Sequence, residues 1–308
     1  MLMAEDINTE DAEETEKAEA GVIEKIKQLT GHGYVKLTGC GDSAIYAALS
    51  AIKNKDPDAA VLMPDQGAWH TYEKHCMKLL LEYKKIKTDR GIIILEELKR
   101  SIAEIKDKKK RCAFILTSFA GYYAAQPMKE ISDICRKNSC MLIEDVSGSI
   151  GLLEYSSALV KELNLCAGLA DICVCSFGKW KPISIGKGGF ISFKDALDKK
   201  NPINLNNLKS SLTNADLNIL LHKLENINKR YAFLFRTAGK IKKELADSNI
   251  FHRNLAGLNV IIGFADEDEK NKLIKYCKDN NYEYVMCPKN IRVEENAVSI
   301  ELKRLEEA

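Results

Sequence analysis

Seven short strand candidates, most of them apolar, with helical periodicity between the earlier ones, constrain the fold of this chain more than any other feature. The candidates lie at 34–37, 59–64, 81–87, 112–118, 140–145, 171–176 and 189–193. Alternating strands and helices favour an α/β fold with a mainly parallel sheet that is covered by helices on both faces. The short connection 177–188 has no helical pattern, so the last strand is expected to run antiparallel.

The remaining segments predict how the chain is divided into domains. Residues 1–20 carry eight acids and one lysine, which is typical of a solvated tail, and 21–200 would form the large domain. Segment 201–247 would link the domains through an Asn- and Ser-rich loop and one long helix from Asp216 to about Leu245, whose apolar residues recur at spacings of three and four. The pattern β-α-β-β over 258–302 predicts a small α+β domain at 248–308.

Composition excludes several functional classes. A net charge of +2 over 308 residues argues against nucleic-acid binding. No apolar run reaches the length of a membrane span, and the acidic start is neither a signal peptide nor a transit peptide. The ten cysteines contain no CxxC pair and no zinc spacing, so we expect no metal and a cytoplasmic, reducing location.

A lysine-rich loop lies between the last two predicted strands. Ser176 precedes Lys181 by five residues, and a glycine cluster follows at 186, 188 and 189. A lysine held at the edge of a buried sheet can lose part of its charge by desolvation and then act as a nucleophile. Because Lys179 and Lys187 share the loop, a solvated basic turn is the alternative interpretation.

The order of residues in this loop resembles the cofactor-lysine segment of fold-type I pyridoxal phosphate enzymes. The segment Ser-Phe-x-x-x-Lys with glycines at +5, +7 and +8 is most similar to the DegT/DnrJ-like sugar aminotransferases. The resemblance implies the fold-type I transferase fold and pyridoxal 5'-phosphate as cofactor. It also implies that Lys181 forms the internal aldimine and later moves a proton as base and acid, and that Ser176 reaches the cofactor phosphate. Lys179 is out of register.

The apolar strand at 140–145 ends in the paired acids Glu144 and Asp145. In open α/β sheets ligands bind at the carboxyl ends of the strands. Asp145 matches the Ile-Glu-Asp segment of the same family, which implies that it holds the pyridine nitrogen protonated. A helix-capping role for Asp145 is the alternative. Gly148 stands where this branch often has Gln or His.

The glycine-rich turn before the second predicted helix has three interpretations. By the resemblance, Gly41, Asp42 and Ser43 bind the cofactor phosphate at a helix N-terminus. An S-adenosylmethionine loop built on Gly39-Cys40-Gly41 and a structural tight turn are the alternatives. A carboxylate beside a phosphate is unfavourable unless Asp42 points away and caps the helix.

Two further pairs of residues are candidates by the resemblance. Trp69 comes five residues after Pro64, and either Trp69 or the adjacent His70 would stack on the cofactor ring. Packing of Trp69 against a helix start is the alternative. Arg304 and Arg292 are candidates for binding the substrate carboxylate, although a basic residue at these places can equally be plain surface.

These patterns predict a pyridoxal phosphate-dependent aminotransferase acting on an unidentified amino acid or amino-sugar type substrate. Its partners would be a small-molecule amino donor and acceptor, and a second copy of the chain in a homodimer. The alternatives are a lyase, a decarboxylase or a non-catalytic protein on the same fold, and an S-adenosylmethionine-dependent methyltransferase.

Overall fold

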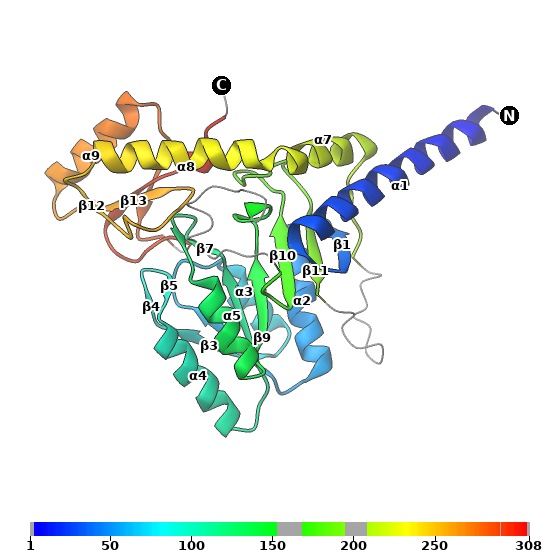
Figure 1. Cartoon of the computed structure of the whole chain (residues 1–308), viewed down its shortest axis with the longest axis horizontal. Coiled ribbons are helices and arrows are strands. Elements are labelled where there is room, and N and C mark those ends of the chain that lie inside the picture. The colour runs from blue at the N-terminus through cyan, green and yellow to red at the C-terminus, as the bar shows by residue number, and fades with distance from the viewer. Residues whose placement is uncertain (1–2, 153–167, 195–207, 290, 307–308) are drawn as a thin grey trace.

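A seven-stranded sheet forms the centre of the computed structural model, which describes residues 3–152, 168–194, 208–289 and 291–306 (Figure 1). The spatial order is β1-β11-β10-β9-β6-β2-β3. The strands are β1 (Tyr34–Thr38), β2 (Ala60–Pro64), β3 (Glu82–Ile86), β6 (Cys112–Thr117), β9 (Met141–Asp145), β10 (Ile172–Ser176) and β11 (Gly189–Phe193). All seven predicted strands are confirmed. β11 runs antiparallel to both of its neighbours, as the short connection before it predicted.

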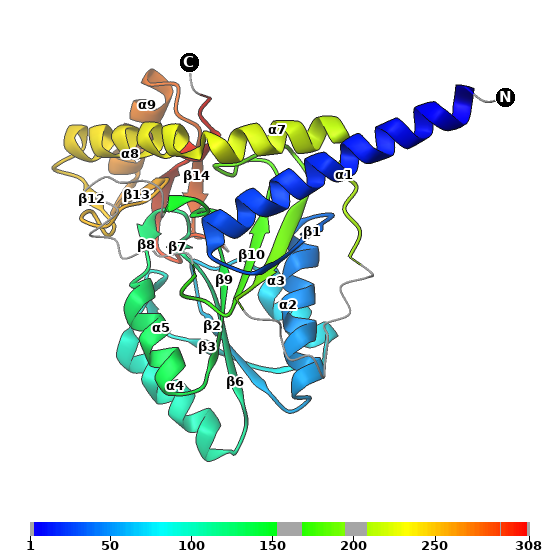
Figure 2. The ribbon, with the colours of Figure 1, turned by 45° about the vertical axis from the view of Figure 1, so that its right-hand side comes forward.

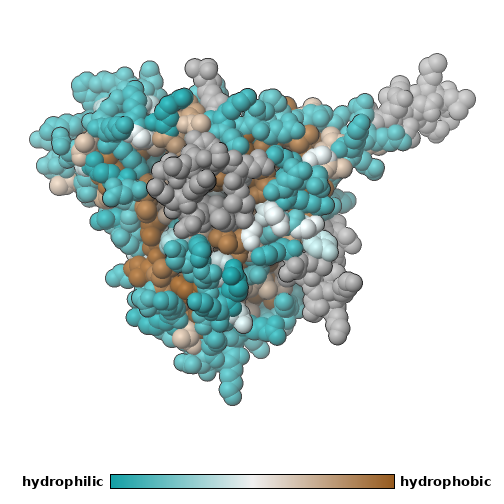
Figure 3. Space-filling model, viewed as in Figure 1, coloured by the Kyte–Doolittle hydropathy of each residue, from teal (hydrophilic) through white to brown (hydrophobic). Residues whose placement is uncertain are grey.

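Helices cover both faces of the sheet. Because successive side chains of a strand point to opposite faces, each strand contributes residues to two cores. Leu62 and Phe114 pack in one core with α1 (Met3–Thr30), α4 (Leu95–Asp107), α5 (Met128–Lys137) and α7 (Asn214–Glu225). Their neighbours Val61 and Ala113 pack on the other face with α2 (Gly41–Lys55) and α3 (Thr71–Lys78). The side of the molecular surface that Figure 3 shows is mostly hydrophilic, with smaller hydrophobic areas. No helix in the described part of the chain is long and apolar enough to cross a membrane.

The acidic start of the chain is helical, which corrects the expectation of a solvated tail. α1 begins at Met3, and its outer end projects from the body of the protein beside α7 (Figure 2). Val22, Ile26 and Leu29 at its other end are fully buried. Residues 3–20 contain no glycine or proline, and their Glu and Ala favour helix, so the helix extends outward from this buried anchor.

The predicted single long helix is two helices. α7 begins after a capping box, in which Thr213 Oγ1 accepts from the amide of Asp216 and the Asp216 carboxylate accepts from the amide of Thr213. α7 ends at Glu225, and α8 (Ile227–Glu244) begins after Asn226. The side-chain amide of Asn226 donates to the carbonyl of His222 at 2.9 Å, an alternative backbone partner that interrupts the helix.

A small antiparallel sheet follows α8. It consists of β12 (Asn249–Ile250), β13 (Val260–Gly263), β14 (Tyr284–Cys287) and β15 (Ala297–Ile300), in the order β12-β13-β15-β14. α9 (Glu267–Asp279) packs against it, and the turn η3 (Leu302–Arg304) follows β15. The predicted β-α-β-β order is therefore confirmed, with β12 added at the edge.

The small sheet is joined to the large one through the hairpin β7 (Phe119–Ala120) and β8 (Ala124–Ala125). The amide of Leu258 donates to the carbonyl of Tyr122 at 2.7 Å. At Gly257 an added Cβ would lie 1.9 Å from the carbonyl oxygen of Tyr123, so only glycine allows this approach. The contacts of Gly257 and Leu258 with the hairpin place Tyr122 between the two sheets. The short strands β4 (Thr88–Asp89) and β5 (Ile92–Ile93) pair with each other before α4.

Candidate active site

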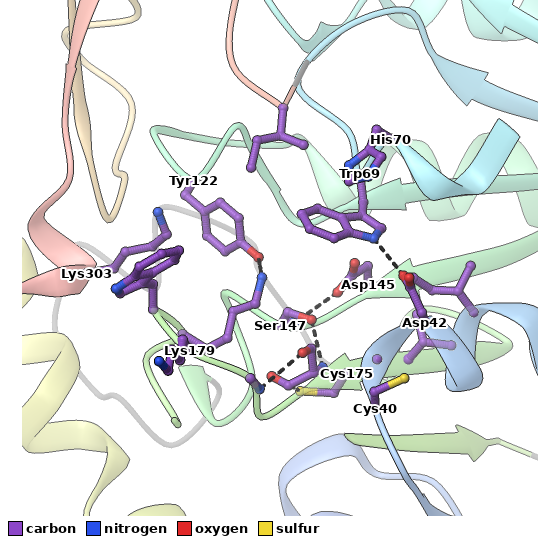
Figure 4. A pocket seen from close by; sticks show the side chains of 18 of the residues that line it. Cys40, Asp42, Trp69, His70, Tyr122, Asp145, Ser147, Cys175, Lys179 and Lys303 are labelled. Carbon is purple, nitrogen blue, oxygen red and sulfur yellow. Dashed lines mark hydrogen bonds between the residues drawn. The ribbon is translucent and has the colours of Figure 1, made fainter. Parts of the chain in front are cut away.

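A cavity of about 580 Å³ lies where β9 and β10 end and the small domain begins (Figure 4). Its walls come from the start of α2, the end of β9, the loop after β10 and the turn η3. This is the place where open α/β sheets bind ligands. The predicted site residues Gly41, Asp42, Trp69, His70, Asp145, Ser176, Lys181, Arg292 and Arg304 all line it. Ser43 does not.

Lys181 is the lysine of the loop that reaches into this cavity. Its Nζ donates a hydrogen bond to the hydroxyl of Tyr122 and lies 4.7 Å from the centre of the Tyr122 ring and 5.3 Å from that of Trp69. Burial lowers the pKa of Lys181, but the nearby Tyr122 and Asp145 raise it, and the net shift is upward. Lys179 is exposed and directed away from Tyr122 (Figure 4), and Lys187 pairs with Asp216 at 2.7 Å.

The loop holds Lys181 in place through buried anchors on either side. Phe177 and Ile183 are buried, and the amide of Ile185 donates to the carbonyl of Phe177 at 2.9 Å. Gly186 and Gly188 have φ angles of +82° and +80°, a conformation that glycine adopts without strain. The glycine spacing read from the sequence therefore has a conformational cause.

Asp145 enters the cavity from the end of β9 and is 6% exposed. Its Oδ2 accepts a hydrogen bond from the Tyr72 hydroxyl at 3.0 Å, and its Oδ1 accepts one from the amide of Ser147 at 3.0 Å. These two hydrogen bonds fix the orientation of the carboxyl group at the end of β9. Tyr72 and Ser147 carry no sequence signal for this role, because each becomes a neighbour of Asp145 only in the fold.

The side chain of Glu144 lies on the face of β9 opposite to that of Asp145 and does not line the cavity. It is buried, its Oε1 accepts from the Ser118 hydroxyl, and its Oε2 has no hydrogen-bond partner among the described residues. Burial raises the pKa of Glu144 to about 7. Gly148, three residues after Asp145, packs against Tyr122: an added Cβ would lie 3.1 Å from the ring. The ring of Tyr122 therefore occupies the space beside residue 148.

The start of α2 forms the floor of the cavity. Gly41 packs so closely on Ser176 that an added Cβ would lie 2.5 Å from the Ser176 Cβ. Asp42 is turned toward the start of α3, where its Oδ1 accepts from Trp69 Nε1 and from the Thr71 hydroxyl, both at 2.8 Å. Asp42 is therefore held by α3 and its neighbouring residues and does not cap α2.

The helix cap at this position is Cys40. Its Sγ accepts from the amide of Ser43 at 3.4 Å and lies 3.2 Å from the Ser43 hydroxyl. The side chain of Ser43 is thereby directed to Cys40 rather than into the cavity. First-turn amides at a helix N-terminus remain suited to a phosphate, and the Ser176 hydroxyl lines the same floor.

Trp69 and His70 take different positions although they are adjacent. The indole of Trp69 is half-buried, fixed by Asp42, and lies over the cavity beside Lys181 (Figure 4). His70 is exposed, and its ring centre lies 4.5 Å from that of Trp69. Of the two rings, Trp69 is the one positioned to stack on a planar cofactor.

The two predicted arginines line the cavity but have partners in the small domain. Arg292 forms a two-point pair with Glu301, at 3.0 Å from Nε and 2.7 Å from an Nη. Arg304 pairs with Glu283 at 2.7 Å, and its guanidinium lies 4.4 Å from the centre of the Trp180 ring. The cavity also contains Tyr122 and Lys303, which sequence reasoning missed because an isolated aromatic in a loop and a lysine near the C-terminus carry no pattern.

The cavity residues fit pyridoxal phosphate. An amine, a carboxylate with two donors, an indole face and a helix N-terminus converge from separate elements on one space. These groups match, respectively, the aldehyde, the pyridine nitrogen, the ring and the phosphate of that cofactor. Among the described residues, no group of three or more His, Cys, Asp or Glu side chains could hold a metal ion.

Residues 12–216 match the DegT/DnrJ/EryC1/StrS aminotransferase family. The chain belongs to this family. Residues 228–308 match a second family model, the MJ1341 family C-terminal domain. A search of curated proteins found no match. The family confirms the expected class, a pyridoxal phosphate-dependent aminotransferase of fold type I. The S-adenosylmethionine interpretation of the Gly39-Cys40-Gly41 loop is not retained, because this loop lies inside the matched family.

Solved structures of the same fold cover most of this chain. A DegT DnrJ EryC1 StrS aminotransferase from Brucella abortus has a TM-score of 0.70 at 17% identity, over 92% of this chain and 84% of that one. A serine palmitoyltransferase from S. paucimobilis has 0.71 at 15%, over 92% and 71%. 3-Amino-5-hydroxybenzoic acid synthase has 0.68 at 12%, over 93% and 85%. At these identities the similarity establishes the fold.

Proposed function

We propose that this protein transfers an amino group between a small amino donor and a carbonyl acceptor, with Lys181 as the cofactor-bearing lysine. The observation that carries the proposal is the convergence of the Lys181 amine and the Asp145 carboxylate on one cavity beside Trp69 (Figure 4). The amine and the carboxylate come from separate segments, and Asp145 is buried while Lys181 is partly buried.

Each residue has a defined task in this proposal. Bound pyridoxal phosphate supplies an electron sink for the charge that develops at the substrate Cα. Asp145 keeps the pyridine nitrogen protonated, and Lys181 Nζ moves the proton at the substrate Cα. The Tyr122 hydroxyl orients Lys181 through their hydrogen bond. Trp69 stacks on the ring.

The phosphate would be held at the floor of the cavity. The first-turn amides of α2 at Gly41 and Asp42 and the hydroxyl of Ser176 are the proposed donors, because the amide of Ser43 already donates to Cys40 Sγ. Support comes from the close packing of Gly41 on Ser176, which brings the loop after β10 next to the helix N-terminus. The side chains of Asp42 and Ser43 take no part, because both are engaged elsewhere.

Two measurements test the proposal. Borohydride reduction of the holoprotein followed by peptide mapping should place the label on Lys181, and a label on Lys179 or Lys187 would refute the assignment. The holoprotein should then be mixed in turn with glutamate, glutamine, alanine and aspartate. Transamination predicts that at least one donor releases a stoichiometric amount of its keto acid.

A different reaction of the same cofactor is the second candidate. A serine palmitoyltransferase is among the solved structures of this fold, so the fold alone does not choose the reaction. The choice depends on which Cα bond is held perpendicular to the cofactor ring. Release of carbon dioxide, ammonia or an aldehyde in the donor experiment, without keto acid, would establish this candidate instead.

We propose a homodimer in a reducing cytoplasm as the working form. The nine described cysteines are free thiols, which suits such a compartment. The projecting α1 and α7 provide a surface on which a second copy can pack (Figures 1 and 2). Light scattering at micromolar concentration should give about twice the chain mass of 34.5 kDa. A monomer that turns over would refute the dimer.

Of the two arginines expected to bind the substrate carboxylate, we propose that Arg304 acts at the rim. Its guanidinium lies on Trp180, and its partner Glu283 is exposed, so a substrate anion can compete for it. Arg292 is 3% exposed and committed to Glu301. We assign Arg292 a supporting position in the cavity wall.

A further inference from the structure

The small-domain wall of the cavity contains two buried cations and one buried carboxylate. The side chains of Arg292, Glu301 and Lys303 are 3%, 0% and 5% exposed. Glu301 accepts hydrogen bonds from Nε and an Nη of Arg292, from the Ser299 hydroxyl at 2.8 Å and from Lys303 Nζ. With both cations protonated, one positive charge is left without a counterion. Such a charge is costly to bury.

Lys303 and Arg292 line the cavity, whereas Glu301 does not. The Nζ atom of Lys303 lies 4.9 Å from the centre of the Tyr122 ring. Glu301 is its hydrogen-bond partner among the described residues, and an ammonium group has three donors. Two donors therefore remain for a ligand. Arg292 is held at more points, because its Nε and both Nη atoms each donate one hydrogen bond, to Glu301 or to the carbonyl of Ile291.

The charged groups around Lys303 decide which cation gives up its charge. Arg292 and Arg304 flank it in the small domain, Lys181 faces it across Tyr122, and Arg230 of α8 donates to its backbone carbonyl. Burial and the charge of Arg292 lower the pKa of Lys303 to about 7, against the opposing effect of Glu301. Because an arginine stays protonated, Lys303 is the residue that loses its proton and so removes the excess positive charge.

We propose that Lys303 forms an anion subsite that binds one carboxylate of the substrate and takes up a proton from solvent as that carboxylate enters. The bound state is then an ammonium between two carboxylates, Glu301 and the ligand, and the wall is neutral overall. A monoanion matches the single spare charge of the wall. That the carboxylate is the substrate's rests on the proposed function, whereas the subsite itself rests on the charges described above.

Proton uptake gives the subsite a pH signature. Below about pH 7 Lys303 is already protonated, so an entering carboxylate takes up no proton there. Above that pH, binding must also take a proton from solvent, and the affinity should fall about tenfold for each further pH unit. A subsite built on arginine alone would show no such dependence.

The test is calorimetric titration of the holoprotein with propionate at pH 8.5, in two buffers that differ in ionisation enthalpy. Propionate has neither an amino nor a carbonyl group to react, so the result does not depend on transamination. We expect uptake of about one proton per bound propionate, and no binding of the neutral propionamide. The absorption of the cofactor, followed at the same pH values, reports separately any proton taken up there.

Three variants complete the test. Lys303→Arg should bind propionate without proton uptake, and Lys303→Gln should lose at least tenfold in affinity at pH 6.5. Lys179→Gln, which removes an exposed lysine of the same cavity, should retain the uptake. The proposal is overturned if propionate does not bind, or if Lys303→Arg takes up as many protons as the unaltered protein. Failure of the donor experiment with normal propionate uptake would refute only the proposed function.

Discussion

The indole nitrogen of Trp69 donates a hydrogen bond of 2.8 Å to Oδ1 of Asp42, and this contact orients both side chains. The same carboxylate oxygen accepts from Thr71, also at 2.8 Å. A carboxylate in the first turn of α2 would otherwise repel a phosphate at the helix N-terminus. The two hydrogen bonds turn the Asp42 side chain toward the start of α3 and hold the indole over the cavity.

The Asp42 contacts predict a difference between two substitutions. Asp42→Ala leaves Trp69 Nε1 and the Thr71 hydroxyl without an acceptor, and we expect the free energy of unfolding to fall by about 1–3 kcal/mol. Asp42→Asn retains an acceptor oxygen and should lose less. Urea denaturation of the two apoproteins measures both values. Equal stability of the two variants would contradict the role given to these hydrogen bonds.

Asp145→Asn should preserve the fold and lower turnover by orders of magnitude. The amide oxygen can still accept from Ser147, but a neutral amide cannot hold the pyridinium proton. Single-turnover rates with an active donor, together with circular dichroism of the variant, provide the measurement. Tyr72→Phe is the matched control, because it removes only one hydrogen bond to Asp145 and should cost far less. Near-normal turnover in Asp145→Asn would exclude the role.

Because Glu144 is buried, we expect the free energy of unfolding to fall as the pH rises from about 4.5 to 7. Burial raises its folded-state pKa from 4.5 to about 7, so the folded protein binds the proton more tightly than the unfolded chain over that interval. The shift corresponds to about 3 kcal/mol, which is present at low pH and lost by pH 7. Glu144→Gln should therefore be more stable than the unaltered protein at pH 8 but not at pH 4.5.

Thermal unfolding of the Glu144→Gln variant and the unaltered apoprotein at several pH values checks this prediction. The difference in melting temperature should grow from pH 4.5 to 7 and then level off. Glu130→Gln, at an exposed position of α5, is the control and should show no such trend. A difference that is constant with pH would mean that Glu144 is ionised in the fold.

Arg292 and Arg304 should respond differently to the same substitution. Arg292→Gln removes two hydrogen bonds to the fully buried Glu301 and leaves Lys303 as its cation, which should cost about 1.5–3 kcal/mol. Arg304→Gln removes a pair whose partner Glu283 is 60% exposed, which should cost about 1 kcal/mol or less. Chemical denaturation compares the two. Similar losses would show that Arg292 is not the supporting residue assigned here.

Local sequence patterns predicted the sheet, the loop of Lys181 and the acid at the end of β9. Most of the strands are short apolar runs that alternate with helical patterns, so they could be located without their partners. Lys181 was singled out by its register against Ser176 and the glycine cluster, in a segment that resembles a known family, and Asp145 by its place at the carboxyl end of an apolar strand. The spacing of Gly186 and Gly188 could be read for the same reason, since positive φ angles favour glycine locally.

The side chains that contact these residues could be identified only from the tertiary structure, because they come from distant parts of the sequence. Tyr122 lies 59 positions before the lysine it contacts, and Asp42 lies 27 positions before the indole that orients it. Lys303 shares the carboxylate of Glu301 with Arg292, and its Nζ lies 4.9 Å from the centre of the Tyr122 ring, which Lys181 also contacts. The charge of a buried group depends on every group around it, and packing from distant segments brings those groups together.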